Sequence, residues 1–340
     1  MGRLASLVIP TRNRAPVLAR TLAALRHQRD RAFEVVIADD GSTDGTRDVC
    51  MRFQGELDLR YVRRAPVGIA AARNAAIRAS KGDVLISCDD DRIPDPDYVA
   101  DHLAAHAGAA PVVACGVQRA IAADWSREAA YTAADVAALC ARHPALVARF
   151  GEPVATLVSE EMIRADLPGA LAAFGLADPY WEHHARPVLA QWPDLAGFAF
   201  PWTLGIGGNT SVPRALAEEV GLLDERFVGW GLEDADFHYR LHVAGARTVL
   251  MAGGTNYHQV HRRGPERVWE WTRNALYFVD KHPALAIYLY IAVVRRRLSL
   301  VEANRVVLED AALGDAAPAV RAELLRLARE NVRGLLAAAA

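Results

Sequence analysis

Three adjacent carboxylates, Asp89, Asp90 and Asp91, are the first residues of this sequence whose types and spacing could do chemistry. Adjacent carboxylates repel one another and lose hydration when buried, so a fold gains little structurally from placing them at a strand end. A divalent cation removes this objection, because Mg²⁺ and Mn²⁺ take hard oxygen ligands together with substrate phosphates. We therefore predict that Asp89 and Asp91 bind Mn²⁺ or Mg²⁺ while Asp90 turns away. A solvated acidic turn is the structural alternative.

A second acidic pair, Glu233-Asp234, follows Gly229-Trp230-Gly231 and opens a segment with helical spacing. The helix macrodipole favours ionised carboxylates in a first turn, which keeps Asp234 available as a general base. Trp230 between glycines predicts a flexible segment whose apolar surface covers a sugar. His258 is a candidate metal ligand. Ordinary first-turn charge would also explain the pair, and a structural role would explain the histidine, so these alternatives stay open.

Polar clusters follow other apolar runs in the first third of the chain. Pro10-Thr11-Arg12-Asn13 follows the first run, and Asp39-Asp40-Gly41-Ser42 follows the second. A carboxylate at such a place can accept hydrogen bonds from a nucleobase or a ribose. Asx-turn and N-cap chemistry explain the second cluster equally well.

The elements that must position these residues alternate between strands and helices. Hydrophobic spacing predicts strands at 4–9, 33–38, 59–63 and 83–87, and helices at 16–26, 43–53 and 68–79. Short connections between them imply an α/β fold with a doubly wound, mostly parallel sheet. Ligands bind beyond the carboxyl ends of such strands, where the polar clusters lie. A helical insertion is expected at about 120–200, a helix at 233–244, a strand at 247–251 and a helical C-terminal tail.

Composition excludes several classes of protein. The net charge of −2 over 340 residues gives no reason to expect a nucleic-acid partner. Four single cysteines suggest neither a zinc ribbon nor a disulfide framework. No signal-peptide pattern is present, so we expect a cytoplasmic protein. The apolar run at 284–294 is too short to span a bilayer. Because Arg295, Arg296 and Arg297 follow it, a peripheral membrane contact of the C-terminal helices stays open beside a simple core helix.

Taken together, these strings resemble the family 2 glycosyltransferases of the GT-A fold and relatives such as the polypeptide GalNAc-transferases. The resemblance extends over residues 4 to about 262. The matching strings are residues 8–14, 39–46, 68–74, 88–91 with 93–95, 207–209, 221–227 and 229–236. It implies a GT-A domain at 1–262, with the insertion at about 120–200, and a helical extension at 263–340. The acceptor is not implied, because the insertion is less similar than the rest.

The resemblance also implies roles for individual residues. Pro10, Thr11, Asn13 and Asp40 would line the base site, and Arg73 would approach the base or a phosphate. Asp89 would face the ribose, with Asp90 beside it, and Asp91 the metal. Gly207, Gly208 and Asn209 would border the donor sugar, which Trp230 would cover, and Asp234, with Glu233, would supply the catalytic base. The family commonly has tyrosine where this chain has Arg12, so base stacking does not carry over.

The function implied is transfer of a sugar from a nucleotide-diphosphate donor, UDP being favoured, to a hydroxyl acceptor with inversion of configuration. One alternative is a nucleotidyltransferase, which usually has a glycine-rich loop after the first strand that this chain lacks. The other is a non-catalytic nucleotide-sugar-binding protein, against which the intact Glu233-Asp234 pair argues.

Overall fold

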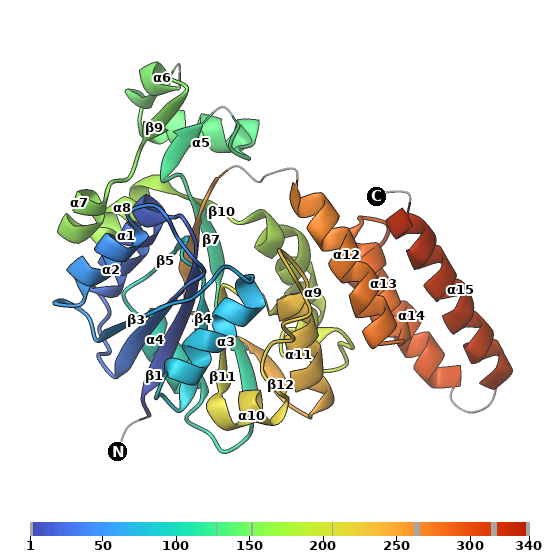
Figure 1. Ribbon diagram of the computed structural model, residues 1–340. Coiled ribbons are helices and arrows are strands. Elements are labelled where there is room, and N and C mark those ends of the chain that lie inside the picture. The colour runs from blue at the N-terminus through green and yellow to red at the C-terminus, as the bar shows by residue number, and fades with distance from the viewer. Residues whose placement is uncertain are drawn as a thin grey trace.

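A seven-stranded sheet forms the centre of the protein (Figure 1), in the order β12-β6-β11-β4-β1-β2-β3. The computed structural model describes residues 3–126, 128–150, 152–205, 207–261, 266–313 and 318–337. The strands are β1 (Ala5–Thr11), β2 (Phe33–Asp39), β3 (Leu59–Arg63), β4 (Val84–Cys88), β6 (Val112–Cys115), β11 (Asn209–Pro213) and β12 (Arg247–Leu250). Only β11 runs antiparallel to its neighbours, β4 and β6. The predicted mostly parallel sheet is therefore confirmed.

Helices cover both faces of this sheet because its central strands are apolar on both sides. Every residue of β1 and β2 is buried. Leu7 and Ile9 pack with α1 and α2, whereas Val8 on the opposite face packs with α3, α10 and α11. These helices are α1 (Ala15–Leu25), α2 (Thr46–Phe53), α3 (Ile69–Ala79), α10 (Arg214–Glu219) and α11 (Glu233–Val243). The doubly wound arrangement places the carboxyl ends of β1, β2 and β4 at one edge, as the sequence predicts.

A second, four-stranded sheet has the order β10-β7-β13-β5 and flanks the same edge. Its strands are β5 (Arg92–Pro94), β7 (Gln118–Ile121), β10 (Gly175–Ala177) and β13 (Asn256–Gln259). β5 begins directly after the acidic triplet and pairs with β13, with Arg92 opposite His258. This pairing brings the histidines of β13 next to the triplet, although more than 160 residues separate them in the chain.

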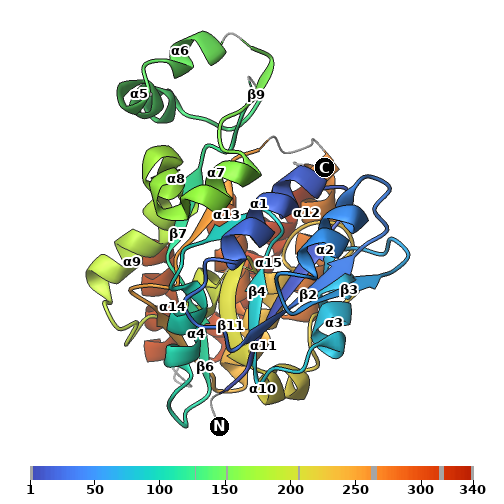
Figure 2. The same ribbon diagram turned by 90° about the vertical axis from the view of Figure 1, so that its left-hand side faces the viewer.

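The predicted helical insertion contains both helices and short strands. The helices are α5 (Ala133–Arg142), α6 (Leu146–Arg149), α7 (Glu160–Ala165), α8 (Leu167–Phe174) and α9 (Arg186–Gln191), with a π-helical turn at Trp181–Ala185. β8 (Asp124–Ser126) pairs with β9 (Val154–Thr156), and β10 joins the second sheet. Figures 1 and 2 show α5, α6 and β9 projecting from the main body. Another helix, α4 (Tyr98–Ala105), contacts β6 of the main sheet.

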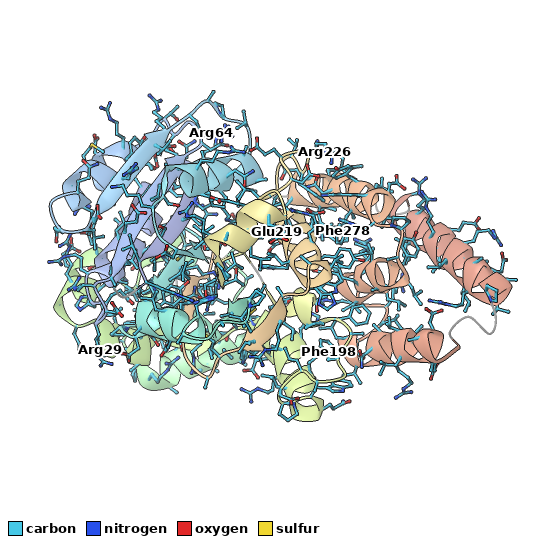
Figure 3. The ribbon with its side chains drawn as sticks, turned by 90° about the horizontal axis from the view of Figure 1, so that it is seen from below. Arg29, Arg64, Phe198, Glu219, Arg226 and Phe278 are labelled. Atoms are coloured by element: carbon cyan, nitrogen blue, oxygen red, sulfur yellow. The ribbon has the colours of Figure 1, made fainter. Side chains whose placement is uncertain are left out.

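Four helices form the C-terminal part: α12 (Glu266–Lys281), α13 (Leu285–Val294), α14 (Leu300–Leu313) and α15 (Pro318–Ala337). They share a hydrophobic cluster with Trp202, Phe227 and Leu232, and Phe278 of α12 lies at this junction (Figure 3). The predicted boundary at 262/263 falls outside the described residues and stays a prediction. None of the described helices is both long and apolar enough to cross a membrane.

Candidate active site

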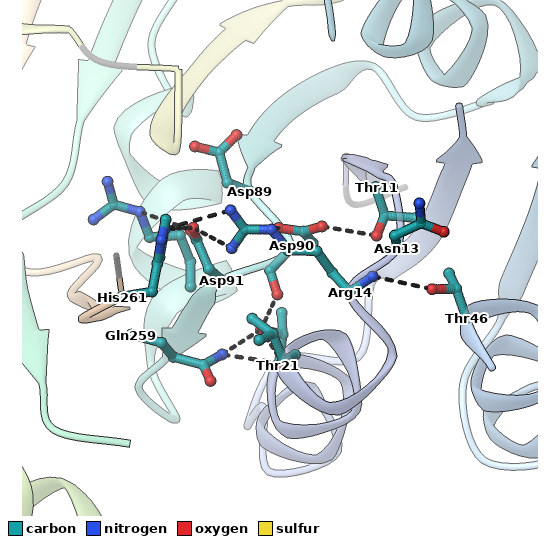
Figure 4. Close-up of polar contacts among 12 residues, drawn as sticks. Thr11, Asn13, Arg14, Thr21, Thr46, Asp89, Asp90, Asp91, Gln259 and His261 are labelled. Atoms are coloured by element: carbon teal, nitrogen blue, oxygen red, sulfur yellow. Dashed lines mark hydrogen bonds and ion pairs between the residues drawn. The ribbon is translucent and has the colours of Figure 1, made fainter. Parts of the chain in front are cut away.

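The acidic triplet lies just beyond the carboxyl end of β4, and its three side chains take different directions (Figure 4). Asp90 turns toward β1 and α1. Thr11 Oγ1 donates a hydrogen bond of 2.7 Å to Asp90 Oδ2, and Thr21 Oγ1 donates one of 2.7 Å to the Asp90 carbonyl. Burial raises the pKa of Asp90 to about 7, although the charge of Arg14 opposes this shift. Asp90 therefore fastens the triplet to the first βα unit.

Asp91 turns the other way, toward β13. Its Oδ2 lies 3.1 Å from His261 Nε2 and 3.6 Å from His258 Nε2. Burial alone would raise the pKa of Asp91, but His258, His261 and Arg92 hold it well below its usual range. One ligand atom from each of Asp91, His258 and His261 lies within 4.8 Å of the others, which is close enough for one ion. A carboxylate with two imidazoles fits Mn²⁺ better than Mg²⁺, which prefers oxygen ligands.

Arg73 of α3 connects the triplet with the second acidic pair. Its Nη2 donates a hydrogen bond of 2.6 Å to Asp89 Oδ1, and its Nη1 lies 3.8 Å from Glu233 Oε1. Only 3% of Arg73 is exposed, whereas the Asp89 side chain keeps 29% exposure. The structure thus brings together two acidic groups that lie more than 140 residues apart in the chain, and it leaves Asp89 accessible.

Gly207 and Gly208 lie between these acidic groups. The Gly207 N–H donates a hydrogen bond of 3.0 Å to Asp234 Oδ2. A Cβ at Gly208 would lie 2.7 Å from Asp89 Oδ2, so a side chain there would displace the carboxylate. Asn209 is fully buried, and its Nδ2 donates to the carbonyls of Val117 and Gly254 at 2.9 and 3.0 Å. Among these three predicted sugar-site residues, the glycines border the acidic groups and Asn209 fixes the start of β11.

Glu233 and Asp234 occupy the first turn of α11, and their environments differ. Leu232 precedes them in a left-handed conformation with φ of 72°. Burial, followed by the charge of Asp234, raises the pKa of Glu233 to about 8. The Glu233 carboxyl also accepts a 3.0 Å hydrogen bond from the Gly231 N–H. Asp234 is only half-buried and is the carboxylate of the pair that an acceptor could reach.

Trp230, predicted to lie in a flexible segment, is held by α12. Its backbone N–H donates a 3.0 Å hydrogen bond to Glu270 Oε2, and Asn274 Nδ2 donates one of 2.9 Å to the Gly231 carbonyl. The guanidinium of Arg267 lies 5.2 Å from the centroid of the Trp230 ring. These contacts fix the loop in front of the acidic pair.

The four residues predicted to line the base site border one edge of the triplet, and their polar contacts hold loops together. Pro10 and Thr11 end β1. Asn13 Oδ1 accepts a 2.7 Å hydrogen bond from the Thr43 N–H, which joins the loops after β1 and β2. Asp40 accepts 2.9 Å hydrogen bonds from the N–H groups of Val67 and Gly68. A carboxylate has further lone pairs, so Asp40 could still accept a bond from a base.

Comparison with known proteins assigns the chain to a family. Residues 6–152 match glycosyl transferase family 2, and residues 193–262 match the N-terminal domain of galactosyltransferase. The chain is 34% identical over 315 residues to validoxylamine A glucosyltransferase of Streptomyces hygroscopicus subsp. jinggangensis (strain 5008). This similarity covers 90% of this chain and 68% of that protein. The chain belongs to glycosyltransferase family 2. This family 2 glycosyltransferase is also 32% identical over 284 residues to the uncharacterized glycosyltransferase YfnE of Bacillus subtilis (strain 168), over 82% of this chain and 70% of that protein.

Solved structures confirm the predicted GT-A fold of this family 2 glycosyltransferase. A mannosyltransferase from Pyrobaculum calidifontis, solved with GDP-Man and Mn²⁺, superposes with a TM-score of 0.54 at 19% identity, covering 100% of this chain and 74% of that one. GalNAc-T7, solved with UDP, GalNAc and Mn²⁺, superposes with a TM-score of 0.50 at 15% identity, over 80% of this chain and 47% of that one.

Three residues of the site, Arg92, His261 and Arg14, were not assigned a role from the sequence of this glycosyltransferase. His261 stands three residues after His258, and that spacing was the available signal. Arg14 Nη1 lies 3.2 Å from Asp91 Oδ2, and Arg14 Nε lies 3.9 Å from Asp90 Oδ1. Nothing in the local sequence distinguishes Arg14 from the neighbouring Arg12, which is exposed.

Proposed function

We propose that this family 2 glycosyltransferase moves a sugar from a nucleoside-diphosphate donor to a hydroxyl acceptor with inversion of configuration. The observation that carries the proposal is the Arg73 bridge, which brings Asp89 of the triplet to Glu233 beside Asp234. A donor diphosphate near the triplet would then present its sugar to Asp234. UDP is the first nucleotide to test, and glucose the first sugar, because the 34%-identical relative is named a glucosyltransferase.

In this mechanism Asp234 accepts the proton of the acceptor hydroxyl as its oxygen attacks the anomeric carbon. The bond from that carbon to the diphosphate oxygen breaks, and the nucleoside diphosphate leaves with the electron pair. The transition state resembles an oxocarbenium ion, as in glycoside hydrolysis. With one base and no enzyme nucleophile, a single displacement inverts the anomeric centre. The Gly207 N–H holds Asp234 Oδ2 in place for this role.

Asp91, His258 and His261 are the residues that would hold a divalent cation, with Asp89 nearer the ribose. A bound cation offsets the charge that grows on the leaving diphosphate. The mannosyltransferase and GalNAc-T7 structures were both solved with Mn²⁺, which supports Mn²⁺ as the ion to test first.

The experiment that tests the proposal replaces the base. Asp234→Asn should lower the turnover of the nucleotide sugar by about 10² or more, the usual scale for a positioned base. Donor binding should persist in this variant. It can be measured as the rise in melting temperature on adding Mn²⁺ and UDP-glucose, because a ligand that binds the folded state stabilises the protein. Asp48→Asn, an exposed first-turn carboxylate of α2, is the matched control. Near-normal turnover of Asp234→Asn would remove this residue from the mechanism.

A further inference from the structure

A cleft of about 370 Å³ lies at the C-terminal end of α13, outside the acidic site. It is lined by Val294, Arg295, Arg296 and Arg297, and by Leu335 from α15. Its volume falls within the range of small-molecule sites. Within the described part of the chain, none of these three guanidiniums forms an ion pair, whereas Arg333 of α15 pairs with Asp280 at 2.6 Å. Three arginines, two of them exposed, therefore line one cleft without forming an ion pair with a carboxylate of the described residues.

The backbone at this point takes a conformation that does not suit its residue. Arg297 N–H donates to the Ala292 carbonyl at 2.9 Å and Arg296 N–H donates to the Val293 carbonyl at 2.8 Å, which is the Schellman pattern of a helix end. Arg296 occupies the left-handed position of this motif with φ of 55°, where glycine is usual. The favourable interaction of cations with a helix C-terminus does not require arginine at that position. A functional use of the Arg296 side chain would account for it.

Trp271 lies between Arg295 of this cleft and the loop that precedes the proposed catalytic pair. The Arg295 guanidinium lies 6.0 Å from the centroid of the Trp271 ring. Trp271 packs against Gly231 so closely that a Cβ there would lie 2.8 Å from Trp271 Cδ1. The Gly231 N–H in turn bonds Glu233. One indole ring thus separates Arg295 from the loop that leads into Asp234, and Figure 1 shows the start of α12 and the end of α15 on the same side of the molecule.

We propose that this cleft binds a phosphate group carried by the sugar acceptor. The proposal rests on the function proposed above, in which Asp234 takes the proton of the acceptor hydroxyl. Guanidinium groups match phosphate oxygens with paired hydrogen bonds, and three of them suit a group with more than one negative charge. The acceptor would lie with its hydroxyl at Asp234 and its phosphate at Arg295, Arg296 and Arg297. The phosphate can belong to a small molecule or to a lipid headgroup.

The first test uses inorganic phosphate as the probe, titrated calorimetrically at low ionic strength with UDP and Mn²⁺ already saturating. Arg296→Gly should weaken phosphate binding roughly tenfold, as expected for one charge-assisted contact. This variant should fold, and its melting temperature should rise, because glycine suits the left-handed position. Arg305→Gln, which removes an exposed charge from α14, is the matched control and should bind phosphate as the wild type does. Equal affinity in Arg296→Gly and wild type would overturn the proposal.

The second test asks whether the cleft serves the acceptor. Phosphate should slow hydrogen exchange at the backbone amides of Trp230 and Gly231 in the wild type, and should do so much less in Arg296→Gly. Binding without this protection would make the cleft an anion site unrelated to the acceptor.

Sedimentation with phosphatidylglycerol and phosphatidylcholine vesicles separates the two sources of phosphate. One outcome is that the protein binds phosphatidylglycerol vesicles through Arg296 without binding free phosphate. That result would show that the cleft contacts a membrane and is not an acceptor site. Donor hydrolysis by the wild type reports on the proposed function independently of all these outcomes.

Discussion

The two acidic groups of the site are supported by different parts of the chain. The triplet is fastened mainly by the first βα unit, through Thr11 and Thr21. The Glu233-Asp234 pair depends on a helix that follows it in the chain, because Asn274 of α12 holds the carbonyl of Gly231. The side proposed to bind the donor is therefore built from a compact motif of the α/β fold. The side proposed to bind the acceptor is held by the C-terminal helices.

The same contrast continues behind the Glu233-Asp234 pair. Asp236 lies two residues after Asp234 on α11 and is completely buried. Lys281, the last residue of α12, has its Nζ 2.6 Å from Asp236 Oδ1. His282, the next residue, has its Nε2 2.7 Å from the same oxygen. The C-terminal helices thus hold both the loop before Asp234 and the helix that carries it.

Removing a ligand from the donor side should have the largest effect. Asp91→Ala should weaken Mn²⁺-dependent UDP binding by at least about 10²-fold, since even outer partners of a metal contribute on that scale. Calorimetric titration of UDP with Mn²⁺ and with EDTA measures this. Asp97→Ala, a surface carboxylate that pairs with Arg29, should bind as the wild type does. UDP binding that is indifferent to both EDTA and Asp91→Ala would contradict a metal at Asp91.

The contrast between the two sides also explains what the sequence could predict. The strands and helices around the triplet follow from hydrophobic spacing, because β1, β2 and β4 are mostly apolar and are followed by polar clusters. The acidic residues of both groups could be identified because carboxylates at element ends have chemical uses. The acceptor side was less predictable. Trp230 between two glycines suggests mobility, and its tether to Glu270 depends on how α12 packs, which no local pattern contains.

Long-range pairing explains the residues that were overlooked at the metal cluster. His261 reaches Asp91 only because β13 pairs with β5, which follows the triplet. Arg14 reaches Asp91 because α1 begins beside the end of β4. Both contacts depend on how distant strands and helices pack together, and other histidines and arginines of the chain lie outside the site.

Removing the charge of Asp236 should have the next largest effect, and on stability. Asp236→Asn should lower the free energy of unfolding by about 3 kcal/mol, as expected when one partner leaves a buried ion pair. Urea unfolding measures the change. Asp280→Asn on the same α12 loses only surface pairs with Arg329 and Arg333 and should cost less than about 1 kcal/mol. Equal losses in the two variants would show that α12 does not support α11 through Asp236.

The pH dependence of this stability has a definite sign. Burial opposes ionisation of Asp236, but its hydrogen bond to His282 and the charges of Arg240 and Lys281 lower its pKa below the ordinary 3.8. Its contribution is therefore complete above the unfolded-state pKa and is lost as pH falls through the lower folded-state pKa. The difference in stability between wild type and Asp236→Asn should narrow only below about pH 4. A difference that already narrows between pH 7 and 5 would assign the effect to another group.

Loosening residues 229–232, the loop before Glu233-Asp234, should have the smallest effect. It is also the sharpest test of whether the two acidic groups have separate supports. Asn274→Ala removes the hydrogen bond to the Gly231 carbonyl, which should cost about 1 kcal/mol of local stability. Hydrogen exchange at residues 229–232 should therefore speed up roughly fivefold, while exchange around Asp89 and Asp90 stays as in the wild type. Asn304→Ala is the matched control, because Asn304 is equally buried but holds the Ala199 N–H instead. Faster exchange at the triplet as well would mean that the two acidic groups share one support, since the donor side would then depend on α12 too.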